Sequence, residues 1–247
     1  MSRTRSMAGH VARWLALLAW CFVALQLALL ARIALMAWVD PASTTFQRSE
    51  MFRLALEKQQ VAWSQTWVDY AAVSVHLKRA VIASEDAGFT SHGGADWEAM
   101  EKAWDRNRQA QARASTRPGA KPGVSKLRGG STITQQLAKN LLLSGERTVF
   151  RKGQELLLAW MLEAVLDKRR ILELYLNHVE WGEGLFGAQA AARHYFRVDA
   201  GRLSADQAAR LAVMLPAPKR FEQRPGSDYL LGRSATIAAR MPSVDLP

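Results

Sequence analysis

The chain of 247 residues has one cysteine, Cys21, and five scattered histidines. A single cysteine excludes an intrachain disulfide, so no disulfide framework can stabilise the fold. Neither the His-x-x-x-His nor the Cys-x-x-Cys spacing of zinc sites occurs in the sequence. A disulfide-stabilised small domain and a zinc enzyme are therefore poor explanations of this chain.

Negative charge is missing from the first 39 residues, and charge of either sign is missing from Trp14 to Ala31. The apolar character resumes after Arg32 and ends at Asp40. At a rise of about 1.5 Å per residue, a helix of this length crosses the hydrocarbon core of a bilayer. The sequence therefore predicts a single transmembrane helix over residues 14–39.

The basic residues before this helix set its orientation. Arg3, Arg5 and Arg13 precede it without any acid, and the positive-inside tendency places such a flank in the cytoplasm. Residues 1–13 are therefore predicted to be cytoplasmic, and the chain from about residue 41 onward to lie outside. A cleaved signal peptide is the alternative interpretation, but the apolar region is longer than a usual signal core.

Strand-like alternation is also missing from the N-terminal half, so the sequence predicts a mainly helical domain. We expect a juxtamembrane segment over residues 40–69, with a helix that starts near Met51, and the folded domain over residues 70–247. Trp63 and Trp67 suit either the membrane interface or a packed core. The formal net charge of +11 suits an anionic partner, which is nucleic acid, an acidic lipid surface or a phosphorylated substrate.

The stretch SEDAGFTSHGGADW, residues 84–97, follows a mostly apolar segment that we expect to be helical from Tyr70 onward. Glu85 and Asp86 stand at the end of that helix, next to a glycine-rich loop. Partial burial of a carboxylate at such a place raises its pKa toward working pH, as a general base requires. Glu85 is therefore a candidate base. The alternative is a pair of helix-terminal acids that face water.

Between this stretch and the next motif, the sequence predicts a helix over residues 98–108 and a mobile basic loop over residues 109–128. The loop contains two Pro-Gly pairs, so it cannot be one regular element. Its position between two motifs suits a place beside an anionic substrate. A solvated loop without function is the alternative.

Residues 129–140 read GGSTITQQLAKN and predict the start of another helix. Thr132, with Gln135 three residues later, forms a capping-box pattern. Glycines before a helix N-terminus expose backbone N–H groups that can hold a phosphate. One apolar stripe at helical spacing consists of Ile133, Leu137 and Leu141. The expected polar face carries Gln135, Gln136, Lys139 and Asn140.

Arg147, Arg151 and Glu155 are spaced by four residues, so they share one face of a helix, and Lys152 lies three residues before Glu155. A solvated ion pair is the simplest interpretation, worth about 0.3–0.5 kcal/mol. Residues 156–162, however, are apolar on every side. This pattern predicts a helix that enters the core at Glu155.

Taken in order, these blocks resemble the signature motifs of the family 51 glycosyltransferases, the peptidoglycan transglycosylases. Residues 85–96 match E-D-x-x-F-x-x-H-x-G-x-D, and residues 151–163 match R-K-x-x-E-x-x-x-A-x-x-L-E. Residues 168–196 and 203–221 are similar to two further motifs, with Gln207 where family members usually have Glu, a change expected to affect local packing. The resemblance implies a mainly α fold, a lysozyme-like helical domain preceded by a single N-terminal transmembrane helix.

The resemblance also implies an enzyme that joins lipid II units into β-1,4-linked glycan strands and releases undecaprenyl pyrophosphate. Glu85 corresponds to the catalytic base. Glu155 corresponds to a catalytic residue that orients cations or helps to hold a divalent metal, Mg²⁺ or Mn²⁺, and no organic cofactor is expected. The implied substrate-binding residues are Asp86, Phe89, His92, Ser131, Thr132, Gln135, Gln136, Lys139, Asn140, Arg147, Arg151 and Lys152.

The expected partners are lipid II, the growing glycan chain, membrane lipids, and cell-wall or division proteins, without nucleic acid. The expected location is the bacterial inner membrane, with the catalytic domain in the periplasm. No Ser-x-x-Lys motif occurs, so the penicillin-binding transpeptidase domain that often follows this module is not expected.

Two alternatives remain open at this point. A lytic, muramidase-like enzyme also uses a catalytic Glu on a helical domain, but glycan cleavage requires neither a cationic pyrophosphate site nor a membrane anchor. A non-enzymatic membrane protein, such as a cell-wall scaffold or a basic nucleic-acid binder, is the second. A nucleic-acid binder would interleave basic residues with exposed aromatic residues, whereas the tryptophans here mostly occupy helical core positions.

Overall fold

The computed structural model describes residues 2–115, 130–143 and 149–247, and the chain divides into two units, residues 1–41 and 42–247. The first unit consists of one long helix, α1 (Ser2–Leu35), and a short turn. Its segment Met7–Leu35 is long and apolar enough to cross a membrane. The helix ends four residues before the end predicted from the sequence, because residues 36–38 form a turn.

The second unit is mainly helical, as the sequence predicts. Its helices are α2 (Thr45–Lys58), α3 (Val75–Glu85), α4 (Trp97–Ser115), α5 (Ile133–Leu142), α6 (Val149–Val165), α7 (Lys168–His178), α8 (Ala188–Phe196), α9 (Ala205–Met214), α10 (Pro218–Glu222) and α11 (Asp228–Arg240). Among the described residues of this unit, short 3₁₀ turns lie at Tyr70–Ala72, Ala200–Arg202 and Met241–Ser243. Residues 42–69, which the sequence assigns to a juxtamembrane segment, belong to this same compact unit.

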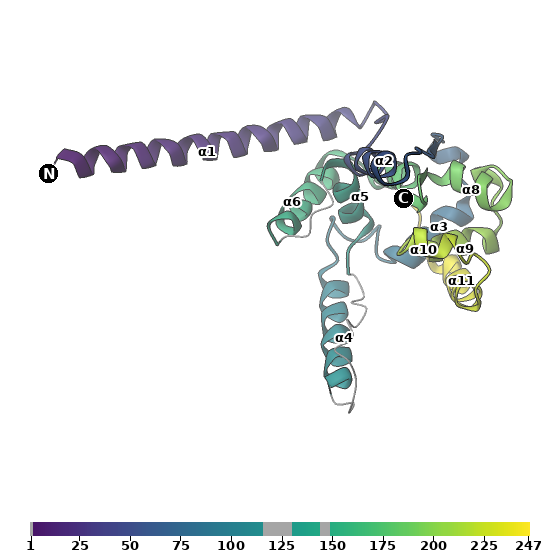
Figure 1. Ribbon diagram of the computed structural model, residues 1–247. Coiled ribbons are helices and arrows are strands. Elements are labelled where there is room, and N and C mark those ends of the chain that lie inside the picture. The colour runs from purple at the N-terminus through teal and green to yellow at the C-terminus, as the bar shows by residue number, and fades with distance from the viewer. Residues whose placement is uncertain (1, 116–129, 144–148) are drawn as a thin grey trace. The chain divides into compact units, whose positions relative to one another are not determined.

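The helices of the second unit form two groups (Figure 1). In one group, α9 packs against α3 and α11. In the other group, α5 packs against α2, α6 and α7. The apolar stripe of α5 is fully buried, which confirms the helical periodicity read from the sequence: Ile133, Leu137 and Leu141 are each at most 1% exposed. Helix α3 buries Leu77, Val81 and Ile82 in the same way.

A small sheet, which the sequence pattern did not predict, lies beside these helices. Its strands are β1 (Ser64–Gln65), β2 (Glu180–Gly182) and β3 (Leu185–Phe186), in the order β1-β3-β2. β3 pairs in parallel with β1 and antiparallel with β2. Strands of two or three residues are too short to show alternation, so periodicity could not reveal them.

Packing around the sheet decides where the two tryptophans lie. The Trp63 ring lies 4.7 Å from the ring of Phe186, which is fully buried, and Trp67 lies 5.8 Å from His178. The backbone at Gly184 lies close to the backbone at Ala62. Only glycine fits there, because a Cβ at position 184 would stand 2.0 Å from the carbonyl oxygen of Ala62. Both tryptophans therefore pack within the domain, which is one of the two locations that the sequence left open.

Helix α4 continues farther than the sequence predicts. The expected helix ended at residue 108, whereas α4 runs from Trp97 to Ser115. Residues 109–115 read QAQARAS, and Ala, Gln and Arg are good helix formers, so nothing in this stretch stops the helix. The rest of the predicted basic loop, residues 116–128, lies outside the described residues.

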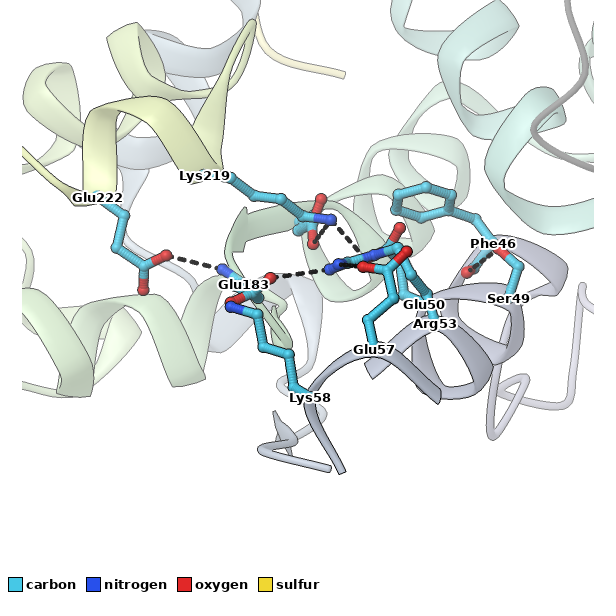
Figure 2. Close-up of polar contacts among 10 residues, drawn as sticks. Phe46, Ser49, Glu50, Arg53, Glu57, Lys58, Glu183, Lys219 and Glu222 are labelled. Atoms are coloured by element: carbon cyan, nitrogen blue, oxygen red, sulfur yellow. Dashed lines mark hydrogen bonds and ion pairs between the residues drawn. The ribbon is translucent and has the colours of Figure 1, made fainter. Parts of the chain in front are cut away.

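Charged side chains connect α2 to α10 and to the turn between β2 and β3 (Figure 2). Arg53 pairs with Glu50 and Glu57 of its own helix and reaches Glu183, 2.9 Å away on the turn between β2 and β3. Lys219 of α10 pairs with Glu50 and lies 3.4 Å from Glu180 of β2. We call the seven residues of this group the α2 charge network: Glu50, Arg53, Glu57, Lys58, Glu180, Glu183 and Lys219.

Candidate active site

Glu85 is the last residue of α3, where the buried helix reaches the junction between the two helix groups. Its Oε2 atom accepts a hydrogen bond of 3.0 Å from the side-chain amide of Gln136 on α5, and the Ser84 hydroxyl lies 3.4 Å from its Oε1 atom. Burial raises the pKa of Glu85 above its usual value, and the neighbouring charge of Asp86 adds to this rise. The hydrogen bond from Gln136 and the charge of Lys139 oppose it. Glu85 is thus a partly buried carboxylate with an affinity for protons that suits a general base.

The amide of Gln136 is itself held by a buried tyrosine. The hydroxyl of Tyr175, on α7, donates to Oε1 of Gln136 over 3.0 Å, and the Tyr175 side chain is fully buried. The sequence pattern does not single out Tyr175, because a tyrosine in an apolar stripe is typical of ordinary core packing. Its signal was the hydroxyl, which needs a polar partner wherever a tyrosine is fully buried.

Asp86 performs a different task from Glu85, although the two are adjacent. Its Oδ2 atom accepts a hydrogen bond of 3.0 Å from the backbone N–H of Ile133, the first residue of α5, and its Oδ1 atom lies 2.9 Å from Nε2 of His92. A carboxylate at a helix N-terminus is stabilised by the helix dipole and by the free N–H groups. Asp86 therefore ties the loop after α3 to the start of α5, and it sets the position of Gln136 relative to Glu85.

Other residues predicted to bind substrate are buried where the loop after α3 meets the start of α5. Thr132 is the N-cap of α5, since its hydroxyl accepts the N–H of Gln135 and donates to the carbonyl of Gly94 over 2.7 Å. Phe89 is fully buried beneath the ammonium group of Lys168, which lies 4.6 Å from the ring centre and also donates to the carbonyl of His92. These contacts position the loop, and direct contact of these residues with a substrate stays a prediction.

A second group of charges lies at the start of α6. The Glu155 side chain is 4% exposed, and it pairs with Lys152 and, over 3.3 Å, with Nη1 of Arg151. Lys152 also donates to the Ser131 hydroxyl over 3.2 Å, which connects α6 to the residues just before α5. The spacing in the sequence predicted this shared face, and the burial of Glu155 contradicts the interpretation as a fully solvated ion pair. The prediction that the helix enters the core after Glu155 with apolar residues buried on every side was wrong. Trp160 remains 47% exposed, and α6 buries one face only.

The polar residues of α5 do not share one face. Gln136 and the exposed Lys139 act on Glu85, while Gln135 and Asn140 are buried. Oε1 of Gln135 is buried without a hydrogen-bond partner among the described residues. Arg147, the remaining residue of the predicted cationic face, lies outside the described residues.

The residues described here do not by themselves form a metal site. Within residues 2–115, 130–143 and 149–247, no group of three or more His, Cys, Asp or Glu side chains is arranged to hold an ion. Glu155 already accepts from two cations, so its carboxylate is not arranged as a free metal ligand. The expected Mg²⁺ or Mn²⁺ stays a prediction, and no step below depends on it.

Comparison with known proteins shows which family the chain is similar to. A model of the family described as transglycosylase matches residues 53–242. A biosynthetic peptidoglycan transglycosylase of Bordetella avium is 49% identical, over 100% of this chain and 99% of that protein. Proteins of the same name from Paraburkholderia xenovorans and Bordetella pertussis are 48% and 50% identical, over 95% and 90% of this chain and 94% and 88% of theirs.

The matched segment contains Glu85, the whole of α5 and the charged start of α6, and it covers nearly all of the second unit. The helical arrangement around Glu85 is that of a lysozyme-like domain. The site and the extent of the match lead to the same assignment. The chain belongs to the transglycosylase family of peptidoglycan-synthesising enzymes.

Proposed function

We propose that this enzyme polymerises lipid II into β-1,4-linked glycan strands and releases undecaprenyl pyrophosphate. The observation that supports it most is the presence of two unlike groups, one beside α5 and one beside the residues just before it. The first group is the Glu85 carboxylate, which has a raised pKa and accepts a hydrogen bond from the neutral amide of Gln136. The second group is the cationic cluster of α6, whose Lys152 donates to Ser131. Polymerisation from a pyrophosphate donor needs both a base and cations, whereas glycan hydrolysis needs no phosphate-binding cations.

Glu85 acts as the general base in this proposal. The 4-hydroxyl oxygen of the incoming lipid II sugar attacks the anomeric carbon of the growing chain from the face opposite the pyrophosphate. The new carbon–oxygen bond forms as the bond to the pyrophosphate oxygen breaks, so the anomeric configuration inverts. The hydroxyl proton passes to the Glu85 carboxylate, which burial makes more basic than a solvated glutamate.

The cations at the start of α6 stabilise the charge that develops on the departing pyrophosphate. Arg151 and Lys152 both pair with Glu155, and we propose that these two cations also contact the pyrophosphate oxygens. Glu155 pairs with both cations and holds them in place. Lys139 and Arg147, which the family resemblance implies at the substrate, are proposed as further cations for the pyrophosphate, and Arg can bind phosphate oxygens with two parallel hydrogen bonds. A divalent cation would supply further positive charge to the pyrophosphate, and activity after chelation and metal addition tests whether the enzyme needs one.

Helix α1 suits a single-pass anchor in the inner membrane, with the second unit in the periplasm where lipid II is consumed. The arginines at positions 3, 5 and 13 support a cytoplasmic N-terminus. A reporter joined by a linker after Pro247 should then be active in the exported compartment. Activity in the cytosol would contradict this orientation and the substrate assignment with it.

Incubation of the detergent-solubilised full-length chain with labelled lipid II tests the activity. The expected product is a ladder of long glycan that a muramidase digests completely, as β-1,4 linkage requires. A parallel incubation with preformed glycan tests cleavage. Fragments of the added glycan would favour the muramidase-like alternative, and no product in either incubation would favour a scaffold.

A further inference from the structure

A continuous chain of hydrogen bonds runs from the core to Glu85. The Tyr175 hydroxyl lies 3.0 Å from Oε1 of Gln136, and Nε2 of Gln136 lies 3.0 Å from Oε2 of Glu85. The three residues come from α7, α5 and α3, so the chain links three helices that are far apart in the sequence. Tyr175 is fully buried, and its only polar atom faces Gln136 rather than a place that a substrate could reach.

The chemistry of the three groups decides which atom donates and which accepts in each of these two hydrogen bonds. An ionised carboxylate can only accept hydrogen bonds, so Gln136 must turn its amino group toward Glu85. Its carbonyl oxygen then faces Tyr175 and needs a donor. Burial, together with the charges of Glu85 and Asp86, raises the pKa of Tyr175 well above its usual value, so the hydroxyl keeps its proton and donates.

Other charged groups near Glu85 do not fix the orientation of the amide. Asp86 follows Glu85 in the chain, and its oxygens are occupied by Ile133 and His92. Lys139, one turn after Gln136 on α5, acts on Glu85 through its charge. From α9, which packs on α3, the carbonyl of Ala212 accepts from Ser84, the neighbour of Glu85.

We propose that Tyr175 is a positioning residue, which locks the amide of Gln136 so that its amino group always faces the Glu85 carboxylate. This inference rests on the proposed function, in which Glu85 is the base. Without the hydroxyl, the amide can rotate by half a turn and present its carbonyl oxygen to Glu85. That arrangement repels a carboxylate and favours its protonated form, so a larger fraction of the enzyme lacks the base at a given pH.

The test is Tyr175→Phe, which removes one oxygen atom and keeps the ring. We expect the acid limb of the kcat/KM profile with lipid II to move upward by about one pH unit, the scale of one lost hydrogen bond near a charged group. The matched control is Tyr195→Phe, because the Tyr195 hydroxyl also donates to a partner within the fold, the carbonyl of Trp181. The control should leave the acid limb unchanged. An unchanged acid limb in Tyr175→Phe, with wild-type turnover, would overturn the inference.

Gln136→Ala gives a second measurement that does not depend on Tyr175. If the hydroxyl acts through the amide, Gln136→Ala moves the acid limb in the same direction, and adding Tyr175→Phe to it produces no further shift. Two shifts that add fully would assign Tyr175 to a separate effect and refute the relay. A fall in melting temperature without a shift of the limb would reduce Tyr175 to packing.

Glu85→Gln separates this inference from the proposed function. If Glu85→Gln retains turnover, the base assignment itself fails. If Glu85→Gln loses turnover while Tyr175→Phe keeps the acid limb of the wild type, the base stands and only the relay fails.

Discussion

Two partly buried carboxylates, Glu85 at the site and Glu50 in the α2 charge network, have opposite surroundings. Arg53 and Lys219 both pair with Glu50, and these hydrogen bonds and charges outweigh burial and lower its pKa. Glu85 instead receives a neutral amide, and burial dominates and raises its pKa. The comparison shows that the choice of partner, rather than burial alone, decides whether a carboxylate ties helices together or accepts protons.

Glu155 occupies an intermediate position in this comparison. It is paired with two cations, as Glu50 is, but its cations belong to the proposed substrate site. In the α2 charge network, the cations pair with neighbouring acids, and Arg53 alone pairs with three glutamates. At the start of α6, Arg151 and Lys152 both pair with Glu155, and in the proposed function the same two cations stabilise the pyrophosphate.

The largest expected effect follows from removing the base. Glu85→Gln keeps the size of the side chain but loses the basic oxygen, so polymerisation of lipid II should fall by about 10²- to 10⁴-fold. The matched control is Glu50→Gln, which alters a partly buried carboxylate of the α2 charge network, away from the site, and should keep turnover per folded molecule. Near wild-type turnover in Glu85→Gln would make this residue an ordinary helix-terminal acid.

The second effect follows from changing the cation at position 151. Arg151→Ala should reduce turnover by about 10²-fold, the scale seen when one stabilising donor is lost from a transition state. Arg151→Lys should recover only part of it, because the two-pronged contact of a guanidinium with phosphate is lost. Normal polymerisation by Arg151→Ala would remove this residue from the site.

A melting curve on the same preparation decides how the loss is read. Inactivity with an almost unchanged melting temperature places Arg151 at the chemistry. Inactivity with a large fall in melting temperature would assign Arg151 to the fold, as Arg53 is assigned in the α2 charge network.

The sequence predicts those parts of the site that depend on local geometry. The N-cap at Thr132 and the face shared by Arg151, Lys152 and Glu155 follow from helical spacing of three and four residues, which any α-helix reproduces. Glu85 could be proposed as the base because its helix ends at a glycine-rich loop. These predictions needed no knowledge of the tertiary structure.

The parts that the sequence could not give depend on contacts between distant segments. Asp86 joins α5 across 47 residues, and Tyr175 meets Gln136 across 39, whereas contact of Asp86 with a substrate stays a prediction. The link between Lys219 and Glu50 spans 169 residues. Charge patterns on single helices do not reveal such pairs, so the α2 charge network was invisible before the fold was known.

The third prediction concerns stability rather than turnover. Arg53→Ala leaves the buried Glu50 with one cation fewer and removes a tie to Glu183, so it should destabilise the second unit by about 1–3 kcal/mol. Lys58→Ala is the matched control, because the Lys58 side chain is 53% exposed and pairs only with Glu183 among the described residues. It should cost less than about 1 kcal/mol. Equal losses in the two variants, measured by denaturant unfolding in detergent, would contradict the central place of Arg53.

The smallest effect is a pair of opposite pH dependences, and it tests the opening comparison directly. The pKa of Glu50 is lowered by folding, so its ionised form adds stability above the unfolded pKa, and this contribution is lost as the pH falls through the lower, folded pKa. The pKa of Glu85 is raised by folding, so ionised Glu85 costs stability above its folded pKa, and the cost disappears as the pH falls below the unfolded value.

At pH 7.5, Glu85→Gln should therefore melt higher than the wild type, and Glu50→Gln lower, each by about 2–4 °C, which corresponds to about 1 kcal/mol in a domain of this size. Near pH 4, both differences should shrink, because the Glu85 cost and the Glu50 contribution both decline as protons bind. Melting curves of the three proteins at the two pH values measure this. A Glu85→Gln variant that melts lower than the wild type at pH 7.5 would show that the Glu85 carboxylate stabilises the fold as Glu50 does. The contrast between a base kept at a cost in stability and an acid that ties helices together would then be lost.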